Sequence, residues 1–437
     1  MGETMWKSFN VVLFVAFCSN LYIYVRQMSM SPVYSEVRQP LAMETSMSSA
    51  HSKAYSPPAM ETWPISSLST RATDEKPNPS GVKNITFTNP RASEFYVDGT
   101  SIPEVSFDVG PSWAGLLPIS SDPDETRKVV QVYRTNGGPG CSALEGLLQE
   151  NGPFAWPPGI AAPVINKHSW TNLSSVLWIE QPVGTGFSQG KPNIEDEDDL
   201  AAQLVGFLQQ FLEVFSELKG KNFYLSGESV SCFFLSPPLV TSNVMSLFFT
   251  TTPGTNRRFS DIANYIFENP GVVDLNVKGI WINNLDDVQS SPPYFARMDV
   301  KKAIHAPLHV KWRKCGMNVV FLHYDKSLPS SFTVLPNVIE KSERTVIVHG
   351  LLDFRFFAEG TRIAIQNMTW NGLQGFQTPI PNENFIVDGI GSLGNMHTER
   401  GLSYIEVNLS GHMVPKDQPQ AAFQIMQYLL GFSTSPA

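Results

Sequence analysis

The sequence predicts an α/β fold in which helices flank a central, mostly parallel β-sheet. Strand-like apolar runs recur along the chain, at 128–133, 175–180, 222–226, 278–283, 344–349 and 402–408. Between the second and third runs, apolar residues keep helical spacing from Leu200 to Phe215, after an acidic stretch that suits a helix N-terminus. A second amphipathic helix is expected over about 419–430. Strands that alternate with helices favour parallel pairing and place functional sites at the carboxyl ends of the strands.

Length and composition suit a single large globular domain with extra segments. The chain has 437 residues, of which 42% are hydrophobic, and a formal net charge of −9. The acidic balance argues against a nucleic-acid partner, which calls for a basic surface. The chain has no phosphate-binding glycine loop and no repeat, so no cofactor is expected. His305 and His309 are four residues apart, but Pro307 between them argues against a helical metal site.

The first element is an N-terminal targeting segment. Lys7 precedes an apolar stretch over 11–25 that ends at Arg26. The stretch is short for a membrane span and suits the core of a signal peptide, so residues 1–26 are interpreted as a signal peptide or a retained signal-anchor. Residues 27–80 are rich in Ser, Met and Pro and read as a flexible or cleaved leader, which leaves 81–437 as the globular domain.

Two glycine-containing turns carry the chemistry. NGGPGCS at 136–142 follows the strand-like run 128–133, and such a turn leaves backbone N–H groups accessible; two of them aimed at one point form an oxyanion hole. NFYLSGESVS at 222–231 places Ser229 on a tight elbow after a strand, with small residues two positions before and after it. The elbow is the position of an acyl-transfer nucleophile.

Two loop residues further along complete a constellation with Ser229. Asp353 follows the strand-like run 344–349, and His412 follows the run 402–408. The order Ser, Asp, His, with each residue just past a strand, is the order of an α/β-hydrolase triad and differs from the orders of the other two common serine-protease folds.

Taken together, the motifs resemble those of the secreted, fungal-type serine carboxypeptidases, which have the α/β-hydrolase fold with a cap. The matching stretches lie over most of residues 110–432. They are WAGLLPIS (113–120), NGGPGCSALEGLLQENGP (136–153), SWTNLSSVLWIEQPVGTGFS (169–188), GES (227–229), DVKKAIHAP (299–307), HGLLDFRFFAEGTRIAIQNMTWNGLQGF (349–376) and SGHMVPKDQP (410–419).

The resemblance implies a role for each triad residue and a reaction. Ser229 is the implied nucleophile, His412 the general base and then acid, and Asp353 the group that orients and stabilises the imidazolium. The N–H groups of Gly138 and Val230 are the implied oxyanion hole. The implied function is a serine-type carboxypeptidase that releases C-terminal amino acids from peptides or proteins.

The resemblance also implies a site for the terminal carboxylate of the substrate. Its positions are Asn136, Gly137 and Glu228, with Glu150 paired to Glu228. Two carboxyls in contact do not both ionise readily, so one of them keeps its proton and can donate a hydrogen bond to the substrate. The expected working range is therefore acidic.

Other features favour the secretory route. Sequons at Asn84, Asn172, Asn367 and Asn408 predict N-glycosylation. The resemblance implies a disulfide between Cys141 and Cys315; Cys18 lies in the signal segment, and Cys232 is left as a free thiol. The protein is expected to be secreted or vacuolar, without a membrane anchor once the signal is removed.

The chain departs from the family in three places. The family usually has Tyr-Ala-Gly after the nucleophile, whereas this chain has Val230-Ser231-Cys232, followed by an apolar, Pro-rich stretch to residue 256 without a family counterpart. A hairpin before Asn136 is missing, and the cap before residue 299 is reduced. Two alternatives therefore stand beside an active carboxypeptidase. They are a catalytically impaired secretory glycoprotein on this scaffold and an acyltransferase or esterase of the same fold.

Overall fold

The computed structural model describes residues 10–16, 86–131, 140–157, 160–228, 257–283, 294–314, 333–353, 357–380 and 383–437. All of these residues belong to one compact unit, which comprises Met1–Asn20 and Asn84–Ala437.

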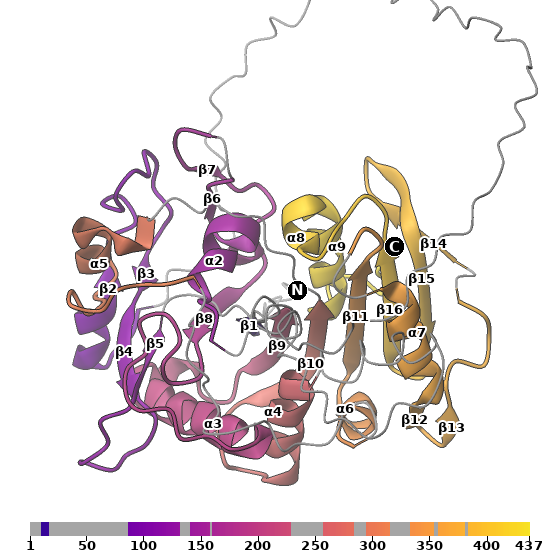
Figure 1. Cartoon of the computed structure of the whole chain (residues 1–437), viewed down its shortest axis with the longest axis horizontal. Helices are drawn as coiled ribbons and strands as arrows, with labels where there is room; N and C mark the ends of the chain where they lie inside the picture. The colour runs from indigo at the N-terminus through magenta and orange to yellow at the C-terminus, as the bar shows by residue number, and fades with distance from the viewer. Residues whose placement is uncertain are drawn as a thin grey trace, which may run out of the picture. The chain divides into compact units, whose positions relative to one another are not determined.

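A ten-stranded mixed sheet forms the centre of this unit (Figure 1). The strands follow one another across the sheet in the order β14-β15-β16-β11-β10-β9-β1-β8-β5-β4. Neighbours from β16 through to β8 pair in parallel, and both edges are antiparallel. The predicted α/β fold with a mostly parallel central sheet is confirmed. The strands are β1 (Asn10–Ala16), β4 (Gly115–Pro118), β5 (Lys128–Gln131), β8 (Ser175–Glu180), β9 (Asn222–Glu228), β10 (Asn276–Asn283), β11 (Arg344–Gly350), β14 (Glu383–Val387), β15 (Gly391–Glu399) and β16 (Leu402–Val407).

Short elements decorate the sheet. Three two-stranded ribbons are formed by β2 (Tyr96–Val97) with β3 (Ser112–Trp113), β6 (Phe154–Ala155) with β7 (Val164–Ile165), and β12 (Thr369–Trp370) with β13 (Leu373–Gln374). Short helical turns cover Pro90–Phe95, Leu147–Asn151, Trp170–Asn172, Ser216–Leu218 and Tyr294–Ala296.

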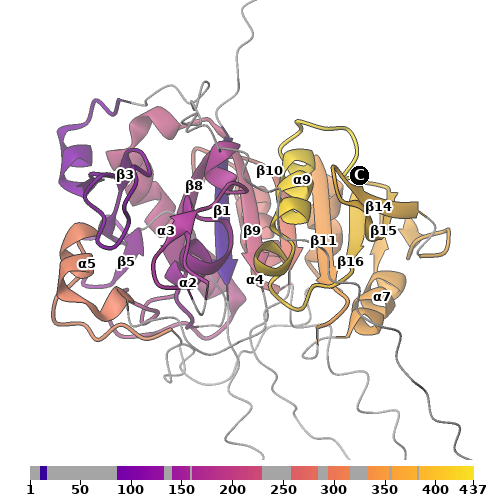
Figure 2. The same cartoon turned by 90° about the horizontal axis from the view of Figure 1, so that it is seen from above.

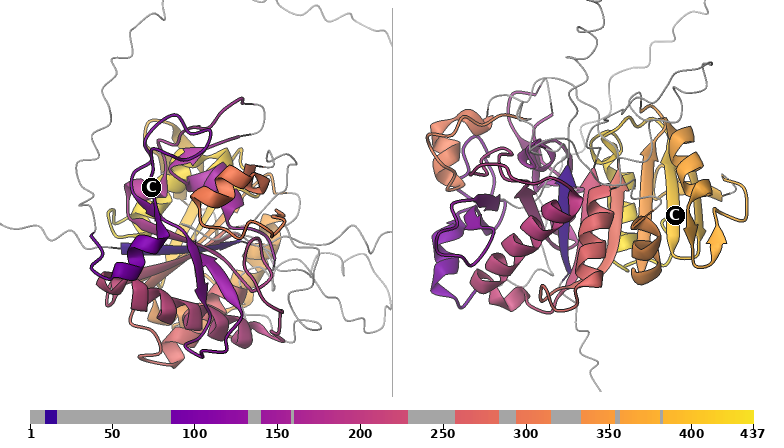
Figure 3. Two further views of the ribbon diagram at one scale, coloured as in Figure 1. Left: turned by 90° about the vertical axis from the view of Figure 1, so that its left-hand side faces the viewer. Right: turned by 60° about the horizontal axis from the view of Figure 1, so that its bottom comes forward.

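Helices lie on both faces of the sheet (Figure 3). One face packs against α3 (Glu197–Val214), α4 (Arg257–Glu268), α6 (Leu335–Lys341) and α7 (Ala358–Asn367), and the other against α2 (Leu144–Gly146), α8 (Val414–Asp417) and α9 (Pro419–Leu429). The short helix α5 (Met298–Ala303) lies further out, beside the helical turn Tyr294–Ala296. Side chains alternate between the two cores along each strand. On β11, Ile347 belongs to the first core, whereas Val346 and Val348 belong to the second. Strands buried on both faces explain the continuous apolar runs of the sequence.

The predicted helix between the second and third apolar runs is α3. Asp196 caps it, because its carboxylate accepts the N–H of Asp199 at 2.9 Å. Leu200, Leu204 and Leu208 are fully buried, as their spacing predicts. Among the helices of the described residues, none combines the length and the apolar character that a membrane span requires.

Strand β1 occupies a central position in the sheet, between β9 and β8 (Figure 2). It runs parallel to both neighbours, and Leu13 pairs with Leu225 on one side and Leu177 on the other. The apolar stretch that is predicted to be a signal peptide includes this strand. The signal assignment of residues 1–26 stays a prediction, and the same β-branched and aromatic residues also suit a β-strand.

Candidate active site

The predicted triad residues all follow strands that end at one edge of the sheet. β9, β10, β11 and β16 are parallel neighbours, so their carboxyl ends meet at this edge. Ser229 is the residue after β9 and lies outside the described residues. Asp353 and His412 lie in the loops that follow β11 and β16.

The structure brings Asp353 and His412 into direct contact. Nδ1 of His412 lies 2.5 Å from Oδ2 of Asp353, and neither side chain is exposed to solvent. A carboxylate accepts only, so the imidazole Nδ1–H is the donor. This bond fixes the tautomer of His412 and makes Nε2 the nitrogen that can accept a proton.

The two loops approach each other closely because residue 350 is a glycine. A Cβ added to Gly350 would lie 1.9 Å from the carbonyl oxygen of Gly411 and 2.6 Å from that of Ser410. The N–H of Leu352 donates to the Ser410 carbonyl at 2.8 Å and ties the loops together. Gly350 was not singled out from the sequence; the available signal was a glycine that ends a strand-like run three residues before the predicted acid.

Of the expected carboxylate-binding residues, the structure describes the side chain of Glu150 alone. Glu150 lies in the short helical turn Leu147–Asn151 and is buried, and its backbone carbonyl accepts a hydrogen bond from the Asn166 side chain at 2.9 Å. Glu228 is the last residue of β9, and its side chain is not described. Asn136, Gly137, Gly138 and Val230 lie outside the described residues.

The end of the first glycine turn is tied to the segment before residue 315. Cys141 is disulfide-bonded, and Cys315 lies outside the described residues. The N–H of Ser142, next to Cys141, donates to the carbonyl of Lys314 at 2.7 Å. The Lys314 ammonium also pairs with Glu145 at 3.1 Å. The neighbours of Cys141 and Cys315 therefore lie side by side, as a bond between these two cysteines requires.

One buried acid near this turn was not singled out from the sequence. Glu180 ends β8, is fully buried, and contacts the hydroxyl group of Ser142. Burial raises the pKa of its carboxyl to about 7, against hydrogen bonds from Ser142, Phe187 and Trp312 that lower it. The sequence signal was an acid at the end of an apolar strand run.

The remaining predicted positions are the four glycosylation sequons. Asn172, Asn367 and Asn408 are exposed, and Asn84 lies outside the described residues. Within the part of the chain that the structure describes, no group of three or more His, Cys, Asp or Glu side chains could hold a metal ion.

Comparisons with known proteins agree on one family. The family model described as serine carboxypeptidase matches residues 128–236 and 275–431. A probable serine carboxypeptidase of Arthroderma benhamiae is 35% identical, with 78% of this chain and 87% of that protein covered. Serine-type carboxypeptidase F of Aspergillus niger is 31% identical, with 80% and 89% covered. In three dimensions, Kex1(delta)p, a prohormone-processing carboxypeptidase from Saccharomyces cerevisiae, matches with a TM-score of 0.61 and 18% identity, over 78% of this chain and 96% of that one.

The comparison also locates differences. The alignment with the Arthroderma benhamiae protein is 463 positions long, which exceeds the 437 residues of this chain, so that relative carries segments that this chain lacks. The family model leaves residues 237–274 unmatched, and these include most of the stretch up to residue 256 that has no expected family counterpart.

Proposed function

The chain belongs to the serine carboxypeptidase family and is a serine-type carboxypeptidase, and we propose that Ser229, His412 and Asp353 carry its reaction. The observation that supports this most is the buried contact between His412 and Asp353 at the sheet edge where β9 leads into Ser229. The proposed reaction is the release of C-terminal amino acids from peptides through an acyl-enzyme.

The chemistry follows from these positions. Ser229 attacks the carbonyl carbon of the last peptide bond while Nε2 of His412 takes the hydroxyl proton. Asp353 stabilises the imidazolium that forms, and the N–H groups of Gly138 and Val230 hold the oxyanion. His412 then gives its proton to the leaving amine, and water hydrolyses the acyl-enzyme by the same steps in reverse.

Recognition of the chain end belongs to a second group of residues. Asn136, Gly137, Glu150 and Glu228 are proposed to bind the terminal carboxylate of the substrate. The burial of Glu150 supports this, because a binding site for a chain end is shielded from bulk water. We propose that the activity is highest in acidic solution, as expected of a site where two carboxyls meet.

Active-site labelling tests the nucleophile. Purified protein is treated with an organophosphonate serine probe at acidic pH, alongside a Ser229→Ala variant. We expect labelling of the native chain and none of the variant, because a nucleophile replacement costs several orders of magnitude in rate. Equal labelling of both proteins would refute the assignment of Ser229.

Peptides with free and blocked C-termini test the proposed carboxylate-binding residues. A peptide with a free C-terminus is compared with its C-terminal amide, and released amino acids are quantified over time. We expect stepwise loss of residues from the free peptide and much slower loss from the amide. Internal cleavage of a peptide blocked at its C-terminus would contradict the proposal.

Two other functions remain proposals for the same scaffold. The first is a catalytically impaired glycoprotein. It is supported by the segments that the Arthroderma benhamiae protein carries and this chain lacks. An acyltransferase or esterase would use the same acyl-enzyme with another acceptor. A folded chain that is not labelled by the probe supports the first alternative. A chain that is labelled, and that turns over an ester substrate but no peptide, supports the second.

We also propose that the chain travels the secretory route and is secreted or vacuolar. The exposure of three sequon asparagines and the disulfide at Cys141 support this route. Endoglycosidase treatment of the protein from its natural source should increase its electrophoretic mobility. Unchanged mobility would argue against glycosylation.

A further inference from the structure

The carboxylate of Asp417 holds the loop that carries His412. This loop, residues 408–413, connects β16 to α8, and we call it the histidine loop. Oδ2 of Asp417 accepts the N–H of Gly411 at 2.8 Å. Gly411 immediately precedes His412, so the hydrogen bond fixes the backbone one residue before the imidazole side chain.

Asp417 lies on a short helix that is anchored in the core. Its own N–H donates to the carbonyl of Met413 at 2.9 Å and closes the turn of α8. The side chains of Met413 and Val414 are buried in the second core. The Asp417 carboxylate therefore reaches the histidine loop from a fixed base.

The side chain of Gln418 supports the start of the same loop. Its amide N–H donates to the carbonyl of Leu409 at 3.2 Å. Leu409 is 71% exposed and has a positive φ of 55°, in the left-handed region that is unfavourable for leucine. Because so exposed a side chain gains little from packing, hydrogen bonds to the backbone are needed to keep the loop in this conformation.

The histidine loop is thus held between α8 and the loop of Asp353. From the side of Asp353, the N–H of Leu352 donates to the carbonyl of Ser410 at 2.8 Å. A Cβ added to Gly411 would lie 3.3 Å from Oδ2 of Asp417 and 3.8 Å from the carbonyl oxygen of Leu352. Both segments therefore approach the loop closely, and loss of the Asp417 contact leaves it held from one side.

We propose that Asp417 is a positioning residue for the reaction: by holding Gly411 it keeps His412 in place for proton transfer. The inference rests on the proposed function, in which His412 is the general base. Nδ1 of His412 must meet Asp353 while Nε2 meets Ser229, and a misplacement of about 1 Å can cost about 100-fold in rate. Asp417 is exposed, so its hydrogen bond adds little to the stability of the whole chain. Its loss should therefore affect the rate far more than the folding.

The experiment compares Asp417→Ala and Asp417→Asn with native protein. Alanine removes the acceptor, whereas the side-chain oxygen of asparagine can still accept the N–H of Gly411. Lys416→Ala is the control, because this side chain on the same helix makes no hydrogen bond among the described residues. The measurements are kcat and KM on a free-ended peptide, the unfolding temperature, and amide hydrogen exchange over the histidine loop.

We expect kcat of Asp417→Ala to fall roughly tenfold to a hundredfold while KM stays within about twofold, because substrate binding is unchanged and proton transfer is impaired. Asp417→Asn should stay within about threefold of native kcat, since a neutral oxygen accepts a somewhat weaker hydrogen bond. Lys416→Ala should match native protein. Unfolding temperatures should differ by less than about 4 °C. The Gly411 amide should exchange about fivefold faster in Asp417→Ala, the factor that corresponds to one ordinary hydrogen bond.

A native kcat or a native exchange rate of the Gly411 amide in Asp417→Ala would overturn the inference. Equal losses in Asp417→Asn and Asp417→Ala would also overturn it, because the effect would then come from the charge of Asp417 and not from its hydrogen bond to Gly411. If native protein has no peptidase activity, the proposed function fails instead. The exchange of the Gly411 amide then still decides whether Asp417 holds the histidine loop.

Discussion

The contact between Asp353 and His412 depends on one glycine, Gly350. Its backbone lies against the carbonyls of Ser410 and Gly411, where a side chain has no space. Both contacts are with backbone atoms, which cannot rotate away as a side chain could. The small size of Gly350 therefore sets the position of His412 relative to Asp353, although Gly350 takes no part in the proposed reaction.

We expect Gly350→Ala to lose both stability and activity. The added methyl group pushes the loops apart, and overpacking of this kind costs roughly 1–3 kcal/mol. Urea unfolding measures the stability, and phosphonate labelling measures the reactivity of Ser229. Gly372→Ala is the control, because an added Cβ there meets open space and costs only the strain of a positive φ, on the order of 1–2 kcal/mol. Labelling at the native rate in Gly350→Ala would contradict the expectation.

The carboxylate of Asp353 gives a second prediction at this scale. In Asp353→Asn the amide can donate to His412, which favours the wrong tautomer. We expect kcat to fall about 10³–10⁴-fold with little change in KM. Asp388→Asn, at an exposed position, should leave peptide turnover unchanged. A loss of less than tenfold in kcat for Asp353→Asn would remove Asp353 from the triad.

Asp353 and His412 could be singled out from the sequence because each follows an apolar strand run and because, with Ser229, they stand in the chain order of an α/β-hydrolase triad. The local sequence was not enough for Gly350 or Glu180. Gly350 is important because it contacts a loop about sixty residues further along the chain. Glu180 is important because it contacts Ser142, which in turn accepts a hydrogen bond from Trp312. Contacts between distant segments leave little trace in a local pattern.

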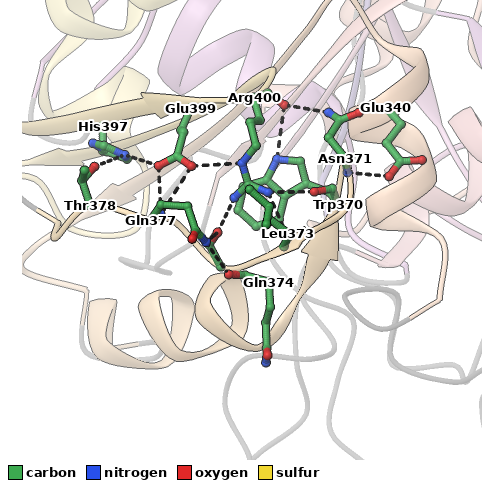
Figure 4. Close-up of polar contacts among 11 residues, drawn as sticks. Glu340, Trp370, Asn371, Leu373, Gln374, Gln377, Thr378, His397, Glu399 and Arg400 are labelled. Atoms are coloured by element: carbon green, nitrogen blue, oxygen red, sulfur yellow. Dashed lines mark hydrogen bonds and ion pairs between the residues drawn. The ribbon is translucent and has the colours of Figure 1, made fainter.

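At the scale of elements, Arg400 ties a small ribbon to the edge of the sheet (Figure 4). Its guanidinium lies 4.0 Å from the ring centre of Trp370, donates to the carbonyls of Trp370 and Leu373 at 2.8 and 2.9 Å, and pairs with Glu399 at 3.0 Å. The planar, forked shape of arginine makes these contacts possible together. Arg400 thus fixes β12 and β13 against β15 and β16.

We expect Arg400→Lys to destabilise this ribbon without removing catalysis. Lysine cannot stack on Trp370 and satisfy both carbonyls, and the carbonyl of the buried Trp370, left without a donor, costs about 1–3 kcal/mol. Urea unfolding should show the loss, and hydrogen exchange should rise over residues 369–377. Arg91→Lys, at an exposed position, is the control and should match native protein. If Arg400→Lys is as stable to urea as native protein, the contacts of Arg400 in Figure 4 make no net contribution to the free energy of unfolding.

The elements that the sequence predicted are the central ones. The strand-like runs at 175–180, 344–349 and 402–408 correspond to β8, β11 and β16 because strands buried on both faces are continuously apolar. β14 and β15 were not predicted. They lie at the sheet edge and mix glycine, asparagine and glutamate with apolar residues, so neither an apolar run nor strict alternation marks them.

At the scale of the whole molecule, a predicted disulfide joins distant parts of the chain. A bond from Cys141 to Cys315 would close a loop of more than a hundred residues, and the chain-entropy model gives about 4–5 kcal/mol for such a loop. We expect reduction to lower both the unfolding temperature and the hydrolytic rate, because the bond also fixes the oxyanion turn. Mass spectrometry of unreduced peptides checks the pairing, and two free thiols would refute it.

Strand β1 is synthesised long before the two strands, β8 and β9, with which it pairs in the sheet. Residues 10–16 emerge first, but both of their partners are made much later, and β9 is complete only when synthesis has passed Glu228. An early strand must therefore wait, apolar and unpaired, for its neighbours. If a signal peptidase cuts the chain after residue 26, it removes β1 and leaves β8 and β9 with open facing edges. Sequencing the N-terminus of the folded protein shows whether β1 is retained.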